Sequence, residues 1–140
     1  MGVLSMLSGV FGCKSNIRPS NSGCKTSFYS LEVAGLRGDT IRFDQFRGKK
    51  VLLVNTASKC GLTPQYEALE ELYKKYGDKF QIIGFPANNF MNQEPGSAED
   101  IAGFCQKNYS VSFLMSEKIS VKGHNMHPVY RWLTDKEQNG

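Results

Sequence analysis

The sequence predicts an α/β domain whose central sheet contains parallel strands, and three observations support this prediction. Two runs, residues 51–54 (VLLV) and 80–85 (FQIIGF), are mostly apolar, as is typical of strands buried on both faces of a sheet. An amphipathic helical pattern lies between them, over residues 63–77, and a second helical pattern begins after residue 97. The order strand, helix, strand, helix favours right-handed crossovers around a sheet with parallel strands.

The chain before the first buried strand contains two short β-prone stretches, residues 28–33 and 40–43. Gly35 and the pair Gly38-Asp39 separate them, and turn residues between two such stretches predict a hairpin.

The first helix is predicted from its ends and from its apolar face. Thr63 suits the N-cap, Pro64 suits the first helical position, and Gly77 suits the C-terminal end. Its apolar residues recur at three- and four-residue spacing: Tyr66, Leu69, Leu72, Tyr73 and Tyr76.

The second half of the chain begins with a loop rich in Pro, Asn and Gly, over residues 86–96. Ser97 and Asp100 form a capping-box pattern that opens a second helix. This helix carries Ile101, Phe104 and Cys105 on one face. Residues 113–115 and 119–121 predict short strands, and residues 127–133 predict a helical turn.

Length and composition exclude several classes of protein. A chain of 140 residues supports one domain with a substantial core, and no run approaches the roughly 18 apolar residues of a membrane-spanning helix. The net charge of +4 is mild, and the basic stretch over residues 37–50 also contains Asp39 and Asp44, so we expect no nucleic-acid partner. The four cysteines include no C-x-x-C pair, which argues against a zinc knuckle and a vicinal dithiol.

Residues 1–27 differ from the rest and predict a leader that is disordered or signal-like, followed by a domain over residues 28–140. The segment VFGC at residues 10–13 resembles the end of a bacterial lipoprotein signal, in which Cys13 would be lipidated. The preceding apolar run is short, is interrupted by Ser and Gly, and has no positive charge before it. We therefore expect a cytoplasmic protein, with a membrane-anchored lipoprotein or an exported protein as the alternative.

Cys60 is the strongest candidate for a catalytic residue. It follows the buried strand at residues 51–54 and precedes the first helix, and α/β folds place reactive groups just beyond the carboxyl ends of sheet strands. The unpaired N–H groups of the helix and the charge of Lys59 favour a nucleophilic thiolate. A buried structural cysteine is the alternative interpretation.

Cys105 lies on the apolar face of the second helix. From its position alone it is a small core residue, or else a thiol that resolves an oxidised Cys60 as a disulfide. The pair His124 and His127 lacks further ligands nearby in the sequence, so we expect no metal and no bound cofactor.

Four stretches together closely resemble the glutathione peroxidase family in its cysteine form, and the likeness runs from about residue 28 to residue 133. The first, NTASKCGLT at residues 55–63, resembles the peroxidatic signature around Cys60. The others are GFPANNF at residues 84–90 continuing to QEPG at 93–96, FCQKNY at 104–109 continuing through Lys118-Ile119 and Gly123, and HPVYRWL at 127–133.

The resemblance implies a thioredoxin-like fold, with a central mixed sheet flanked by helices. It also implies a peroxidase that reduces hydrogen peroxide or organic hydroperoxides and protects against oxidative stress. On that basis the thiolate of Cys60 becomes a sulfenic acid, Cys105 is the candidate resolving thiol, and the reductant is glutathione or thioredoxin. A membrane partner is expected only if Cys13 is lipidated.

The sequence also departs from the family pattern. Asn89 occupies the position of the family's active-site glutamine, so its amide is one methylene shorter, and Ala87 stands where the family often has cysteine. The family's Trp-Asn-Phe motif belongs beyond Gly140, together with a final strand and helix. We therefore expect a domain short at its C-terminal end, with exposed apolar sheet surface and an unpaired edge.

Two alternatives to a peroxidase remain open at this point. A redox sensor or relay would pass the oxidation of Cys60 to a partner protein. A weakened domain that acts only as a binding module would leave Cys60 no more reactive than free cysteine.

Overall fold

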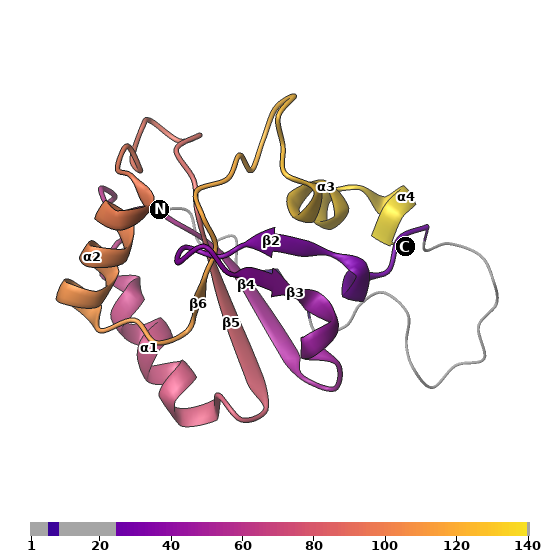
Figure 1. The fold of residues 1–140 in the computed structure, drawn as a ribbon, viewed down its shortest axis with the longest axis horizontal. Coiled ribbons are helices and arrows are strands. Elements are labelled where there is room, and N and C mark those ends of the chain that lie inside the picture. The colour runs from indigo at the N-terminus through magenta and orange to yellow at the C-terminus, as the bar shows by residue number, and fades with distance from the viewer. Residues whose placement is uncertain (1–5, 9–24, 140) are drawn as a thin grey trace.

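A computed structural model describes residues 6–8 and 25–139, and its architecture is α/β, with other elements packed on both faces of a central sheet (Figure 1). Cys13 and Cys24 lie outside the described residues. The strands are β1 (Met6–Ser8), β2 (Glu32–Ala34), β3 (Thr40–Arg42), β4 (Lys50–Thr56), β5 (Phe80–Pro86) and β6 (Leu114–Met115). The helices are α1 (Gln65–Tyr76), α2 (Ala98–Tyr109), α3 (Pro128–Thr134) and α4 (Lys136–Asn139), with 3₁₀ turns η1 (Phe28–Ser30) and η2 (Phe43–Phe46).

The central sheet has the strand order β1-β4-β5-β6 and is mixed, as predicted. β4 and β5 run parallel along their whole length, from the pair Lys50–Phe80 to the pair Thr56–Pro86, and β6 continues in the same direction. β1 pairs antiparallel with β4, so the edge of β4 away from β5 is paired over three residues, Val51 to Leu53. β2 and β3 form the predicted hairpin as a separate antiparallel pair.

Alternate residues of the two buried strands enter different halves of the core, because successive side chains of a strand point to opposite faces. On one face, Leu52, Val54 and Ile82 pack with residues of α1 and α2. On the other face, the neighbouring strand residues pack with the β2–β3 hairpin, η2 and α3. Burial on both faces explains why β4 and β5 are nearly continuous apolar runs.

The helices that cover the first face begin and end largely where the sequence predicts. α2 opens with the predicted capping box: the Ser97 hydroxyl accepts from the Asp100 N–H at 3.2 Å, and the Asp100 carboxylate accepts from the Ser97 N–H at 2.9 Å. In Figure 1 α1 and α2 lie together on one side of the sheet, opposite α3 and the β2–β3 hairpin. Within residues 6–8 and 25–139, no helix is both long and apolar enough to cross a bilayer.

Some local predictions are wrong. Residues 28–30 form the 3₁₀ turn η1 in place of a strand. Residues 119–121 form no strand: the Ile119 N–H binds the Pro86 carbonyl at the end of β5 at 3.0 Å, but the Val121 N–H binds the Asn89 side chain at 2.8 Å instead of a strand carbonyl. Thr63 does not cap α1, which begins at Gln65, because its hydroxyl is used in the preceding turn.

Candidate active site

The turn that carries Cys60 leaves the carboxyl end of β4 and leads into α1, as predicted. The Thr63 side chain closes it: the hydroxyl accepts from the Cys60 N–H at 3.0 Å and donates to the Ala57 carbonyl at 3.0 Å. The Thr63 N–H donates to the Cys60 carbonyl at 3.0 Å. One threonine therefore holds both the backbone N–H and the carbonyl of Cys60.

The side chain of Cys60 is not fully enclosed by the fold. The side chain is half-buried, and its neighbours Gly61 and Leu62 are exposed. The Leu62 N–H points at Sγ, with 3.5 Å between nitrogen and sulfur. This N–H, which lies just before the N-terminal end of α1, favours negative charge on the sulfur.

The segment after β5 supports the Cys60 turn from the neighbouring strand. The buried carboxylate of Glu94 accepts from the Ser58 hydroxyl at 3.1 Å, and the Gln93 carbonyl accepts from the Lys59 N–H at 3.0 Å. Burial raises the pKa of Glu94 above its usual value, while Ser58, Lys118 and Lys59 oppose that rise. The two residues before Cys60 are thus anchored to the loop after β5.

Lys118 holds the same segment from its other side. Its ammonium donates to the carbonyls of Glu94, Pro95 and Gly96, and the shortest of these contacts is 2.7 Å, to Gly96. A cation beside three carbonyl oxygens keeps this part of the loop in place. Sequence analysis missed both Glu94 and Lys118, although both lie within the stretches that resemble the family.

Asn89 lies in the loop after β5, and its amide is used to join that loop to residues 119–121. Oδ1 accepts from the Val121 N–H at 2.8 Å, and Nδ2 donates to the Ser120 hydroxyl at 3.0 Å. Among the described residues, the hydrogen bond recorded at the Cys60 sulfur comes from the Leu62 N–H and not from Asn89. The support of the sulfur by Asn89 stays a prediction.

Cys105 is buried on the inner face of α2, and both it and Cys60 are free thiols. Cys105 belongs to the apolar cluster between the sheet, α1 and α2, and Cys60 packs against that same cluster. The fold thus brings the two predicted thiols to one cluster, although 45 residues separate them in the chain.

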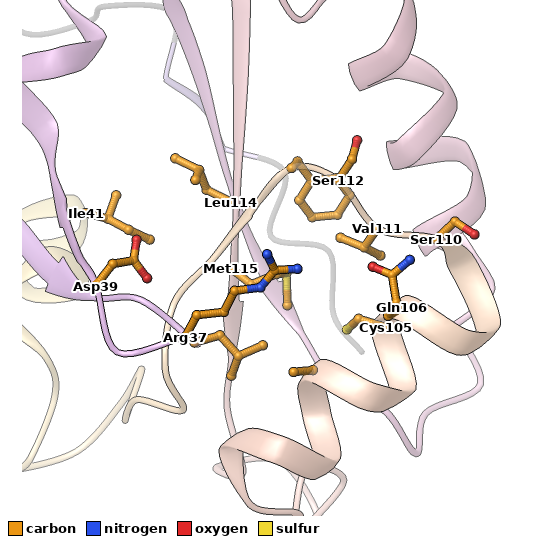
Figure 2. Close-up of a pocket in the computed structure, with 13 residues that line it drawn as sticks. Arg37, Asp39, Ile41, Cys105, Gln106, Ser110, Val111, Ser112, Leu114 and Met115 are labelled. Atoms are coloured by element: carbon orange, nitrogen blue, oxygen red, sulfur yellow. The ribbon is translucent and has the colours of Figure 1, made fainter.

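A cavity of about 600 Å³ has Cys105 in its wall (Figure 2). α2 contributes Cys105 and Gln106 to its wall, the β6 strand contributes Leu114 and Met115, and the turn between β2 and β3 contributes Arg37. Cys105 therefore belongs both to the cluster against which Cys60 packs and to the wall of this cavity.

His127 serves as the N-cap of α3 rather than as part of a site with Cys60. Its Nδ1 accepts from the Val129 N–H at 3.3 Å, and burial lowers its pKa below the usual value. An accepting Nδ1 requires that this nitrogen carry no proton, in agreement with the direction of the pKa change.

The chain is similar to proteins of one known family. The family model described as glutathione peroxidase matches residues 28–134. Glutathione peroxidase-like peroxiredoxin 2 of Saccharomyces cerevisiae is 57% identical over 113 residues, which cover 80% of this chain and 70% of the yeast protein. Glutathione peroxidase-like peroxiredoxin gpx1 of Schizosaccharomyces pombe is 56% identical over 115 residues, covering 81% of this chain and 73% of the relative.

Solved structures confirm the thioredoxin-like fold. T. cruzi GPX1 superposes with a TM-score of 0.57 at 33% identity, over 77% of this chain and 65% of that one, so this chain spans just under two thirds of its length. A secreted Mycobacterium tuberculosis disulfide oxidoreductase homologous to E. coli DsbE superposes with a TM-score of 0.51 at 12% identity, over 63% of this chain and 60% of that one, and shows the fold alone. The family model matches most residues of the chain, and the two yeast proteins are identical to it at more than half of the aligned positions. The chain therefore belongs to the glutathione peroxidase family.

Proposed function

We infer that the protein is a thiol-dependent peroxidase of the peroxiredoxin type, which reduces hydroperoxides with Cys60 as its nucleophile. The position of Cys60 carries this inference, since its half-buried side chain follows the carboxyl end of β4 and a backbone N–H points at its sulfur. The yeast relatives, which are named glutathione peroxidase-like peroxiredoxins, support the same reaction.

The first half of the reaction needs only Cys60 and the peroxide. The thiolate attacks one peroxide oxygen, the O–O bond breaks, and the departing oxygen takes up a proton to leave as water or an alcohol. The sulfur is oxidised to a sulfenic acid while the peroxide is reduced. The Leu62 N–H and the N-terminal end of α1 stabilise the attacking thiolate.

The second half returns Cys60 to its thiol, and we assign the resolving role to Cys105. The Cys105 sulfur attacks the sulfenic acid, and hydroxide leaves as water when it takes up the proton from the Cys105 thiol. The resulting disulfide is reduced by two further thiols. A thioredoxin-type dithiol is the proposed reductant, because it supplies both thiols from one molecule, and glutathione is the alternative.

The peroxidase assignment is tested by peroxide consumption with the full chain. Thioredoxin with its reductase and NADPH, or glutathione with its reductase, serves as the reducing system. We expect Cys60→Ser to abolish turnover, while Cys24→Ser, the matched control, keeps it. Undiminished turnover by Cys60→Ser would refute the assignment.

The role of Cys105 is tested by mass spectrometry after one equivalent of peroxide. We expect a disulfide between Cys60 and Cys105, and we expect Cys105→Ser to lose thioredoxin-dependent turnover while its Cys60 is still oxidised. A sulfenic acid that persists on Cys60 of the unmodified chain would instead support a one-cysteine cycle with glutathione.

A further inference from the structure

The hydroxyl of Tyr66 is buried without a hydrogen bond. Tyr66 lies in the first turn of α1 and is fully buried, and among the described residues its hydroxyl has no hydrogen-bond partner of standard geometry. Buried polar groups of native proteins are nearly always paired, and an unpaired one is costly. This hydroxyl therefore requires an explanation that simple core packing does not supply.

The packing of the Tyr66 ring fixes the position of this hydroxyl. The ring stacks on Tyr109, with 5.3 Å between centroids and 27° between planes. On another side it lies nearly parallel to Phe113, with 6.4 Å between centroids. Two aromatic neighbours leave the ring little freedom to turn its hydroxyl elsewhere.

The groups that the hydroxyl faces come from three different parts of the fold. They are the thiol of Cys105 on α2, the hydroxyl of Thr56 at the end of β4, and, at longer range, the carboxylate of Glu94 in the loop after β5. The Thr56 hydroxyl is likewise buried and unpaired. Burial raises the pKa of Tyr66, so its hydroxyl keeps its proton and remains a donor.

The surroundings of Cys105 are otherwise unfavourable to a thiolate. Burial raises the pKa of the Cys105 thiol, the contact with Tyr66 lowers it, and the charge of Glu94 raises it. The turn between β2 and β3 adds two charged residues, Arg37 and Asp39, to the wall of the cavity that Cys105 also lines (Figure 2). The pKa of Cys105 is shifted by Tyr66 and Glu94 and by neither of these two residues. Tyr66, which packs in the same apolar cluster as Cys105, is the uncharged group that favours the charged form of this thiol.

We propose that Tyr66 is a positioning residue for the resolving step, its hydroxyl donating a hydrogen bond to the Cys105 sulfur as that sulfur becomes a thiolate and attacks the Cys60 sulfenic acid. The S–S bond forms as the S–O bond breaks, and the departing hydroxide becomes water with the proton that left the Cys105 thiol. No external oxidant or reductant enters this step. The proposal rests on the resolving role assigned to Cys105 above.

The contact itself is tested without any turnover. In the full chain with Cys13→Ser, Cys24→Ser and Cys60→Ser, Cys105 is the remaining thiol, and its titration is followed by thiolate absorbance against pH. We expect Tyr66→Phe to raise the pKa of Cys105 by about one to two units, because a hydrogen bond to a charged group is lost. An unchanged pKa of Cys105 would overturn the proposal.

The matched control is Tyr109→Phe, which removes a hydroxyl from the other ring of the same stack. A second control, Thr56→Val, removes the other unpaired hydroxyl. We expect neither control to raise the pKa of Cys105. Tyr66→Phe keeps the buried ring and removes an unpaired hydroxyl, so its thermal unfolding temperature should not fall.

The catalytic consequence is measured in the chain with its native cysteines, by quenching after one equivalent of peroxide and quantifying the Cys60–Cys105 disulfide. If the pKa of Cys105 is higher by one unit, the fraction of Cys105 that is thiolate near neutral pH falls to about one tenth. Each thiolate is about threefold more nucleophilic, because nucleophilicity rises with pKa. We therefore expect disulfide formation to be about threefold slower in Tyr66→Phe. Oxidation of Cys60 should keep its rate. An unchanged rate of disulfide formation would overturn the positioning role.

The two inferences fail in distinguishable ways. A raised pKa of Cys105 in Tyr66→Phe, together with no Cys60–Cys105 disulfide in the unmodified chain, would overturn the resolving role of Cys105 and with it the catalytic part of the proposal. A disulfide that forms equally fast in both proteins would overturn the role of Tyr66 and leave the resolving role of Cys105 intact.

Discussion

The Glu94 carboxylate accepts a hydrogen bond from the Ser58 hydroxyl, with 3.1 Å between Oγ and Oε2. Ser58 lies two residues before Cys60, the proposed nucleophile. The two residues follow neighbouring parallel strands, Ser58 after β4 and Glu94 after β5. The carboxyl ends of such strands meet at one edge of the sheet, so a short bond between the two loops fixes the Cys60 turn against the body of the fold. Glu94 itself is only 1% exposed, so its partners determine whether its burial is tolerated.

Replacing Ser58 with alanine should destabilise the protein. The substitution removes a donor from a buried carboxylate, which costs about 1–3 kcal/mol of unfolding free energy. Urea denaturation of the two proteins measures this difference. Ser30→Ala is the matched control, because its hydroxyl donates at the surface to the Ser27 carbonyl, and it should change stability by less than about 0.5 kcal/mol. Equal midpoints for Ser58→Ala and Ser30→Ala would contradict this account.

The stability of the protein should depend on the ionisation of Glu94. Burial raises the pKa of Glu94 above 4.5, so the folded chain holds this proton more tightly than the unfolded chain does. Its contribution to stability is therefore fully present below pH 4.5 and is lost as the pH rises through the folded-state pKa. Glu94→Gln cannot titrate, so we expect the wild type to lose stability relative to Glu94→Gln across that window. Parallel curves of unfolding free energy against pH would exclude the effect.

Acid should weaken the attachment of α3 through His127. Burial lowers the pKa of His127 from 6.5, although Glu117 opposes the change, so the folded chain favours the neutral ring. The stabilisation is present above pH 6.5 and is lost as the pH falls through the lower folded-state pKa. Protonation of Nδ1 also removes the acceptor for the Val129 N–H, and loss of an N-cap costs about 0.5–2 kcal/mol.

The measurement is the unfolding free energy between about pH 5 and pH 8, the range in which histidine titrates. His127→Asn keeps a capping acceptor without a titrating ring, so its stability should depend less on pH than that of the wild type. His124→Asn is the control, because His124 is exposed and lies outside α3. A pH dependence that survives in His127→Asn would show that another group is responsible.

Local sequence patterns were sufficient to predict the framework of the domain. β4 and β5 were predictable because burial on both faces demands near-continuous apolar runs. The start of α2 was predictable because both members of its capping box, Ser97 and Asp100, lie within four residues of each other. The position of Cys60 followed from the order of strand and helix alone.

Contacts between distant segments were not predictable from local patterns. Glu70 is a charged residue in a helix, a type usually found at the surface, yet it is buried. Its carboxylate binds the Ser112 N–H at 2.8 Å and the Ser112 hydroxyl at 2.6 Å, and Ser112 lies 42 residues further along the chain. Glu94 is buried for the same reason. Residues 119–121 resemble a strand in sequence, but the Val121 N–H binds the side chain of Asn89 in the loop after β5. Thr63 is a residue type that often caps helices, but its hydroxyl bonds within the turn before α1.

The predicted role of Asn89 differs from the hydrogen bonds that its side chain makes in the structure. Its position in the family pattern predicts support of the Cys60 sulfur, while its recorded bonds join the loop after β5 to Ser120 and Val121. Val121 is buried, so its N–H depends on the Asn89 oxygen for a partner. The Asn89 amide therefore has a structural role, in addition to the predicted contact with the Cys60 sulfur.

Asn89→Ala should destabilise the protein by about 1–3 kcal/mol, because it leaves the buried Val121 N–H unpaired. Ser120→Ala removes only the acceptor for Nδ2 and keeps the bond to Val121, so its loss should be smaller, about 0.5–1.5 kcal/mol. Urea denaturation checks both values, and equal losses would show that the Val121 bond carries no special weight. The rate of Cys60 oxidation by peroxide in the same two proteins tests the predicted contact with the sulfur. That contact requires Asn89→Ala to slow the oxidation while Ser120→Ala, which retains the amide, leaves it unchanged.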